Sequence, residues 1–250
     1  MSVTTTEAAR IRAEYASREQ RLEPDAYSLT RPANLFAHVQ RQRGILKRLR
    51  DEGLLPLSGR KILDVGCGGG QHLLDLLAWG ADPSNLAGID LIETRVALAV
   101  RRLGPRPDCA DGPDLRVGDA SCLPWPDESF DIVHQNTVLT SILDDVMRAA
   151  VAREIVRVLK PGGVLIWYDF LFDNPRNANV RGIGASELRS LFPRCECRLE
   201  RITLAPPIAR RLVPITWAGA LLLEGLTILN THYLALIRKT DASGPPQVRC

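Results

Sequence analysis

The chain has 250 residues, of which 45% are hydrophobic and 24% charged, and this is enough apolar material for one α/β domain with appendages. Its formal net charge is +3 and its pI about 8.6, whereas nucleic-acid-binding domains concentrate far more positive charge, so we predict no nucleic-acid partner.

The first residues are charged where a secretion signal is apolar, and no apolar run reaches the roughly 20 residues that span a bilayer. We therefore expect a cytoplasmic protein whose six cysteines are reduced.

Two polar helices are predicted before residue 60. Residues 4–20 and 34–52 both place apolar side chains at helical spacing among charges, and prolines separate the two segments. Asn34 is the predicted N-cap of the second helix. We assign residues 1–58 to a helical N-terminal segment, which either acts as a cap or lid or covers an edge of a sheet.

From Lys61 onward, short apolar runs alternate with helical segments. The predicted strands are 61–65, 85–90, 114–117, 130–135, 163–169, 197–204 and 232–238. The predicted helices between them are 71–79, 93–102, 144–159 and a short one capped by Ser186. Nearly continuous apolar strands separated by helices indicate a parallel sheet covered on both faces. The pattern predicts an α/β fold, a Rossmann-like, doubly wound and mostly parallel seven-stranded sheet, in a domain spanning residues 59–239.

The connection between the last two predicted strands is unusually long. Residues 205–231 begin with prolines and then become apolar, whereas a plain hairpin needs about two to five residues. This apolar insertion has three interpretations: a hydrophobic wall over a bulky ligand, a membrane contact with Arg210, Arg211 and Trp217 at the headgroups, or a homodimer surface or core packing. The tail, residues 240–250, is predicted to be disordered.

The most informative run is Lys61-Ile-Leu-Asp-Val-Gly-Cys-Gly-Gly-Gly70. A buried strand ends near Asp64, and a glycine turn then opens a helix, so a ligand can touch the backbone and a carboxylate can accept from free N–H groups. A dinucleotide fingerprint requires a third glycine where this chain has Gln71, which disfavours an NAD-dependent oxidoreductase. An acidic residue at the end of the first strand suits an ammonium group better than a pyrophosphate.

Acidic residues also end the next two predicted strands. Asp90 ends the second strand, where a carboxylate can accept from both hydroxyls of a ribose. Asp119 follows the third strand, where it can accept from an adenine amino group. Because parallel strands place their carboxyl ends at one edge of the sheet, Asp64, Asp90 and Asp119 are expected around the glycine turn.

Four segments in order resemble the successive motifs of class I S-adenosylmethionine-dependent methyltransferases: DVGCGGG, the strand ending at Asp90, GDASCLPWPDESFDIV and RVLKPGGVLIWYDF. The resemblance covers Lys61 to Asp169. It implies S-adenosyl-L-methionine as cofactor and S-adenosyl-L-homocysteine as product. The cofactor-binding residues that it implies are Asp64, Gly66, Cys67, Gly68, Gly70, Asp90, Leu91, Asp119, Ala120 and Gln135.

The resemblance also directs the search for acceptor residues. A methyl group on a sulfonium is already electrophilic, so the protein must align the acceptor, exclude water and, for a hydroxyl or ammonium acceptor, supply a base. Candidates beyond the fourth and fifth strands are His134 and Asp169 as catalytic groups, and Asn136, Asn174 and Arg181 as substrate-binding groups. His134 has a second interpretation as a core residue within its strand.

Residues 136–142 bear on metal binding. Some quinone O-methyltransferases hold a divalent metal there with Glu and Glu-His, whereas this chain has Thr137, Thr140 and Ser141. Hard cations prefer carboxylate oxygens, so we predict no metal. The favoured function is methyl transfer to a small-molecule or lipid-like natural product, on oxygen rather than nitrogen. A non-catalytic cofactor-binding scaffold or partner subunit and an N-methyltransferase are the alternatives.

Overall fold

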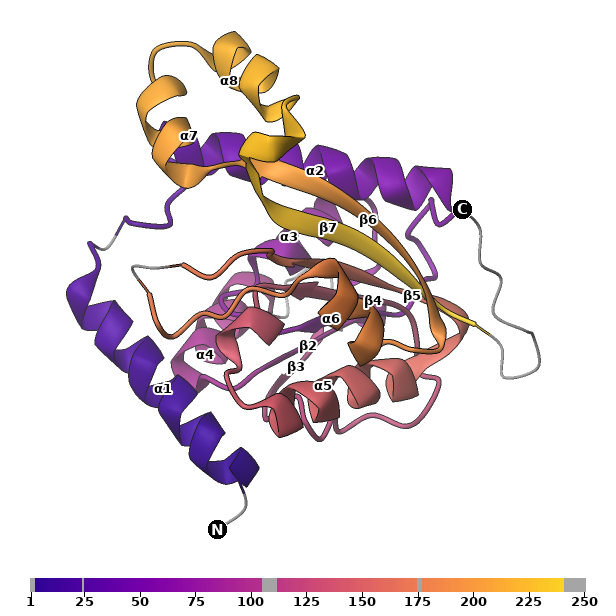
Figure 1. The fold of residues 1–250 in the computed structure, drawn as a ribbon. Helices are drawn as coiled ribbons and strands as arrows, with labels where there is room; N and C mark the ends of the chain where they lie inside the picture. Colours follow the sequence, from indigo (N-terminus) through magenta and orange to yellow (C-terminus); the bar gives the residue numbers. More distant parts are fainter. Residues whose placement is uncertain (1–2, 24, 105–111, 175–176, 241–250) are drawn as a thin grey trace.

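The computed structural model describes residues 3–23, 25–104, 112–174 and 177–240. Within these residues the strands form one seven-stranded sheet in the order β3-β2-β1-β4-β5-β7-β6 (Figure 1). The strands are β1 (Ile62–Val65), β2 (Leu86–Asp90), β3 (Asp114–Val117), β4 (Phe130–Asn136), β5 (Leu159–Phe170), β6 (Cys195–Leu204) and β7 (Asn230–Lys239). Neighbours pair in parallel except that β7 runs antiparallel to β5 and β6. The predicted Rossmann-like, mostly parallel sheet is confirmed.

Helices cover both faces of this sheet. The α-helices are α1 (Val3–Arg21), α2 (Pro32–Asp51), α3 (Gln71–Ala78), α4 (Glu93–Leu103), α5 (Asp145–Val158), α6 (Ala185–Leu191), α7 (Pro206–Leu212) and α8 (Trp217–Glu224). Three short 3₁₀ turns are η1 (Pro83–Asn85), η2 (Leu139–Ser141) and η3 (Thr227–Leu229). One core packs side chains of α1, α5 and α6 on the sheet face that carries Leu63 and Val133. A second core packs α2, α3 and α4 on the face that carries Ile62 and Ile132. Because both faces are covered, the strands are apolar throughout.

The predicted helix caps differ from those in the structure. The N-cap position of α2 is Arg31, and Pro32 occupies the first turn, where its fixed φ favours a helix start. The prediction of Asn34 as N-cap is therefore wrong. Its side-chain amide instead donates to the carbonyls of Ala26 and Ser28 and holds the turn before α2. The Ser186 cap is also wrong, because Gly184 occupies the N-cap position of α6 and makes no side-chain cap bond.

The two N-terminal helices pack on opposite faces of the sheet. Ala8 and Ile11 of α1 belong to the first core, and Ile45 and Leu49 of α2 belong to the second. Both helices are thus integral to the packed body. The assignment of residues 1–58 as a separate unit stays a prediction.

The apolar insertion forms α7, α8 and η3. It packs on the first half of α2 through a small third core that includes Phe36, Val213 and Ala220. The rings of Phe36 and Trp217 meet edge to face with centroids 5.0 Å apart. Figure 1 shows α7 and α8 at one end of the molecule, beyond α2. The predicted disordered tail lies outside the described residues from 241 onward.

Candidate active site

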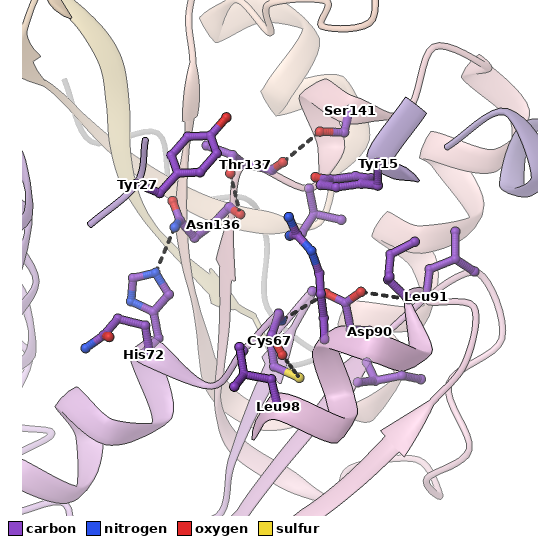
Figure 2. Close-up of a pocket in the computed structure, with 18 of the residues that line it drawn as sticks. Tyr15, Tyr27, Cys67, His72, Asp90, Leu91, Leu98, Asn136, Thr137 and Ser141 are labelled. Atoms are coloured by element: carbon purple, nitrogen blue, oxygen red, sulfur yellow. Dashed lines mark hydrogen bonds between the residues drawn. The ribbon is translucent and has the colours of Figure 1, made fainter. Parts of the chain in front are cut away.

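A cavity of about 1020 Å³ lies at the carboxyl ends of β1, β2 and β4. Its wall includes residues of the glycine loop, the segments that follow β2, β3 and β4, and the helices α1 and α2 (Figure 2). The sequence-predicted site residues in this wall are Gly66, Cys67, Gly68, Asp90, Leu91, Asp119, Ala120 and Asn136. The fold therefore brings together eight predicted residues from four separate segments of the chain.

The glycine loop leaves part of its backbone open to the cavity. Gly66 and Gly68 have positive φ angles of 72° and 51°, which glycine adopts without steric cost. A Cβ on Gly66 would lie 2.3 Å from Cγ2 of Val138, so this position is closed by packing. A Cβ on Gly68 would meet no described heavy atom closer than Nη1 of Arg95 at 3.9 Å. The main chain at Gly68 is thus accessible to a ligand.

Asp90 joins the end of β2 to the glycine loop. Its Oδ2 accepts from the N–H of Gly68 at 2.9 Å, and its Oδ1 accepts from the N–H of Ile92 at 2.8 Å. Burial raises the pKa of Asp90, and these two N–H donors oppose that rise. Each carboxylate oxygen retains a free lone pair for another donor. The carboxylate can therefore accept from the two hydroxyls of a ribose, as the sequence predicts.

The end of β3 supplies a second carboxylate and apolar surface. Asp119 lines the cavity and accepts from the N–H of Ser121 at 2.8 Å. Ala120, Ile142 and Met147 line the same cavity and provide the apolar contacts that a flat heteroaromatic ring requires. The residues present fit the nucleoside and amino-acid parts of S-adenosylmethionine.

Asp64 and His134 pair with each other outside the cavity. They are register partners on β1 and β4, and Nδ1 of His134 lies 2.8 Å from Oδ1 of Asp64. Both are buried, and neither Oδ2 of Asp64 nor Nε2 of His134 has a partner among the described residues. Neither residue is among those that line the cavity. The structure thus places His134 in the core, which is its second interpretation from the sequence, and a catalytic His134 and a cofactor-binding Asp64 stay predictions.

Asp169 and Gln135 hold the turn that follows β4. The carboxylate of Asp169 is fully buried and accepts from the hydroxyl and the N–H of Thr140. Burial raises the pKa of Asp169 to about 7. Gln135 donates to the carbonyl of Tyr168 at 3.1 Å and accepts from the N–H of Leu139 at 3.2 Å. Neither residue is among those that line the cavity, so the structure shows structural contacts for both, and a catalytic Asp169 and a cofactor-binding Gln135 stay predictions.

Gly70, Cys67 and Arg181 make other contacts in the structure. Gly70 has a φ of 81° at the start of α3, and a Cβ there would lie 2.6 Å from Cδ1 of Leu103. The thiol of Cys67 faces Gly88 rather than the cavity, so Cys67 presents its backbone to the site. Arg181 forms ion pairs with Asp145 and Glu187. Gly70, Arg181 and Asn174 are not among the described residues that line the cavity, and their predicted ligand contacts stay predictions.

His72, which follows the glycine turn on α3, lines the cavity but was not among the predicted site residues. Its Nε2 lies 2.7 Å from Nδ2 of Asn136, and its Nδ1 lies 3.6 Å from Oδ2 of Asp75. Figure 2 shows His72 and Asn136 facing each other in the cavity wall. Burial lowers the pKa of His72 well below its usual value, and the positive charges that His134, Arg41 and His38 can carry lower it further. The imidazole is therefore neutral near pH 7. Its position directly after the glycine turn was the sequence signal.

The N-terminal helices close the cavity. Tyr15 of α1 lies against Arg95 of α4, with the guanidinium carbon 4.3 Å from the ring centroid. Arg10 anchors α1 by donating to the carbonyl of Ser141 at 2.7 Å. From α2, His38 and Arg41 line the wall near His72. Residues that precede the glycine loop in the sequence thus line the cavity, although all the sequence motifs lie in or after this loop.

The described residues also show how the chain stands toward metal ions and membranes. In that part of the chain, no group of three or more His, Cys, Asp and Glu side chains is arranged to hold a metal ion. The absence of a metal requirement stays a prediction. No helix within the described ranges is long and apolar enough to cross a membrane.

Comparison with known proteins identifies the family. Residues 63–167, from β1 to β5, match a family model described as a methyltransferase domain. Residues 63–167 of this chain are therefore a class I S-adenosylmethionine-dependent methyltransferase domain. The matched segment of this methyltransferase contains the glycine loop, Asp90 and Asp119, which are the residues that fit the cofactor.

Two curated relatives of this chain are named as methyltransferases of a demethylrifamycin and of phthiotriol dimycocerosates. The chain is 38% identical over 127 residues to 27-O-demethylrifamycin SV methyltransferase of Amycolatopsis mediterranei, covering 50% of this chain and 44% of that one. It is 35% identical over 138 residues to phthiotriol/phenolphthiotriol dimycocerosates methyltransferase 1 of Mycobacterium ulcerans, covering 55% and 48%. The chain thus spans about half the length of these relatives.

A solved structure supports the fold over nearly the whole chain. A phosphoethanolamine N-methyltransferase of Haemonchus contortus, in complex with phosphoethanolamine and S-adenosylhomocysteine, superposes with a TM-score of 0.65. The match covers 99% of this chain and 52% of that one at 12% sequence identity. At this identity the similarity concerns the fold alone.

Proposed function

We propose that this methyltransferase transfers the methyl group of S-adenosylmethionine to an oxygen atom of a bulky small-molecule or lipid-like acceptor. The main support for the proposal is one continuous cavity of about 1020 Å³. It is lined both by the residues that fit the cofactor and by Tyr27, His72 and Ser141. Its volume is at the upper end of the roughly 300–1,000 Å³ found for small-molecule pockets. It can hold the cofactor and a second molecule together. The named substrates of the two relatives support the same class of acceptor.

The residues that would hold the cofactor have separable tasks. The open main chain at Gly68 receives the amino-acid part, the carboxylate of Asp90 accepts from the ribose, and Asp119 accepts from the adenine amino group. When bound, S-adenosylmethionine supplies a methyl group on a sulfonium, which is electrophilic without further activation. The protein therefore contributes alignment and the exclusion of water.

We assign His72 as the group that takes the proton of the acceptor hydroxyl. A neutral imidazole can accept a proton, and burial keeps His72 neutral near pH 7. Its Nε2 accepts from Nδ2 of Asn136 in the cavity wall, so this amide must turn away before Nε2 can take the hydroxyl proton. Asp75 lies 3.6 Å from the other ring nitrogen and favours the tautomer with the proton on Nδ1. Base catalysis of this kind suits a hydroxyl acceptor, because a hydroxyl must lose its proton when it is methylated.

Asn136 orients the acceptor side of the site. Its Oδ1 is buried and has no hydrogen-bond partner among the described residues. An unpaired buried carbonyl oxygen costs about 1–3 kcal/mol. A donor on a bound molecule would remove this cost. We expect the ammonium group of the cofactor to be that donor, because the acceptor hydroxyl gives its only proton to His72.

A transfer assay tests the proposal. Purified protein and S-adenosylmethionine are incubated with hydroxylated polyketides, phenols, lipid diols and, as the nitrogen-acceptor arm, primary amines. Mass spectrometry then measures S-adenosylhomocysteine and methylated product. Methylation of a hydroxyl supports the proposal, and methylation confined to amines contradicts the assignment to oxygen. Tight cofactor binding without transfer to any of these acceptors would favour the non-catalytic scaffold.

A further inference from the structure

Exposed apolar side chains are concentrated in the apolar insertion, residues 205–231. Of the fourteen large hydrophobic residues that are exposed in the described part of the chain, six lie between residues 215 and 228. They are Ile215, Trp217, Leu221, Leu222, Leu226 and Ile228. Ile215, Leu222 and Ile228 are 81%, 77% and 79% exposed. A local concentration of this kind marks a contact surface rather than the scattered apolar residues of an ordinary surface.

The charges around these side chains are cationic. The insertion contains three charged residues, Arg210, Arg211 and Glu224. Both arginines are exposed in the last turn of α7. Glu224 is half-buried, and its carboxylate accepts from the N–H of Thr203 at 3.2 Å. The surface therefore presents apolar side chains beside two exposed positive charges.

The geometry points to an anionic lipid surface as the partner. We propose that the apolar insertion docks on such a surface, with Ile215, Leu222 and Ile228 in the acyl boundary and Arg210 and Arg211 at the phosphate headgroups. Interfacial segments combine apolar and basic residues in this way. The three apolar side chains come from the α7–α8 turn, α8 and η3, at an end of the molecule that projects beyond α2 (Figure 1). A projecting end suits shallow insertion better than the broad face that a stable dimer requires.

The insertion is firmly attached to the wall of the cavity. Trp217 packs edge to face on Phe36 of α2, and the same part of α2 contributes Asn34, Ala37 and His38 to the cavity. A docked lipid surface would therefore lie one helix away from the acceptor site. This relation rests on the proposed function, whereas the docking itself does not require it.

Co-sedimentation of the full chain with vesicles tests the proposal. We expect binding to phosphatidylcholine vesicles that contain phosphatidylglycerol and weaker binding to phosphatidylcholine alone. The triple variant Ile215→Ser/Leu222→Ser/Ile228→Ser should lose about tenfold or more in vesicle affinity. The double variant Arg210→Gln/Arg211→Gln should lose the preference for phosphatidylglycerol, and added salt should have the same effect on the wild type.

A matched control removes exposed apolar residues elsewhere. Val100, Val117 and Val146 are 46%, 53% and 61% exposed, and the variant Val100→Ser/Val117→Ser/Val146→Ser should bind vesicles like the wild type. Thermal unfolding verifies that every variant is folded, and no cofactor or acceptor is added, so failure here is distinct from failure of the methyltransferase proposal. Wild-type protein that ignores both vesicles, or a triple variant that binds unchanged, overturns the proposal. A dimer in light scattering that the triple variant abolishes would assign the surface to a second copy instead.

Discussion

Asn136 and His72 meet in the cavity wall, with Nδ2 of the amide 2.7 Å from Nε2 of the imidazole. The contact joins the end of β4 to the first turn of α3. It fixes a neutral histidine beside the loop that fits the cofactor. The acceptor chemistry of this methyltransferase is therefore assigned to α3 rather than to the ends of β4 and β5.

Replacing His72 tests this assignment. His72→Gln keeps a polar side chain but cannot take a proton, so we expect kcat to fall by about 10²–10⁴-fold with a hydroxyl acceptor. Affinity for S-adenosylhomocysteine should change little, because His72 faces Asn136 rather than Asp90. Single-turnover rates and calorimetry measure the two effects. His38→Gln, which changes a neighbouring cavity histidine, is the control and should retain most of the rate. An unchanged rate in His72→Gln would remove His72 from catalysis.

Asp90 is expected to control cofactor affinity. In Asp90→Ala two ribose hydroxyls lose a charged acceptor, and the N–H groups of Gly68 and Ile92 lose their partner. Hydrogen bonds to a charged group contribute about 1.5–3 kcal/mol, which corresponds to a loss of roughly 10- to 100-fold in affinity. Calorimetric titration with S-adenosylhomocysteine measures it. Asp82→Ala, on the surface turn before β2, should bind normally. Wild-type affinity in Asp90→Ala would place the ribose elsewhere.

Two loop glycines should respond differently to substitution. Gly66→Ala places a Cβ against Val138, where an ideal Cβ would lie 2.3 Å from Cγ2, and should lower the free energy of unfolding by about 2–4 kcal/mol. Gly68→Arg meets little steric hindrance but strains the backbone at a φ of 51°, so it should lose about 1–2 kcal/mol of stability, remain folded and lose cofactor binding. Urea denaturation and calorimetry distinguish these outcomes. Normal binding of S-adenosylhomocysteine by Gly68→Arg would show that the cofactor does not contact the main chain at Gly68.

The buried Asp169 should make stability depend on pH. Its pKa in the folded state is about 7, above the usual 3.8, because of burial. The folded protein therefore retains a proton that the unfolded chain releases. The resulting stabilisation is complete below about pH 4 and is lost as the pH rises through 7.

Asp169→Asn removes this titration. The free energy of unfolding of the wild type, relative to that of Asp169→Asn, should fall by about 2–3 kcal/mol between pH 5 and pH 8. Denaturant unfolding of both proteins at the two pH values measures the difference. A difference that does not change with pH would show that Asp169 is ionised in the folded state throughout.

The strands were predictable because each is an apolar run with a polar or glycine boundary. That Gly68, Asp90 and Asp119 line one cavity was predictable, because each lies at or just after the end of a strand and the carboxyl ends of these strands share one edge of the sheet. Orientation at the strand ends was harder to predict. His134 and Asp169 lie inside strands in the prediction and in the structure, but only the structure shows that His134 turns to Asp64 and Asp169 to Thr140 of η2. One residue of difference reverses the face of the sheet.

The N-terminal contribution to the site was not predictable in detail. Tyr15, His38 and Arg41 reach the cavity because α1 and α2 dock on opposite faces of the sheet. Helical periodicity shows that these segments have an apolar side. It does not show which face of a distant sheet that side covers.

Calorimetric titration of the folded wild-type chain with S-adenosylhomocysteine decides whether the cavity binds the cofactor. We expect one site of micromolar affinity, abolished in Gly68→Arg and weakened in Asp90→Ala. No heat of binding from wild-type protein whose thermal unfolding is cooperative would contradict it, because the cavity at the ends of β1, β2 and β4 would then not be a cofactor site.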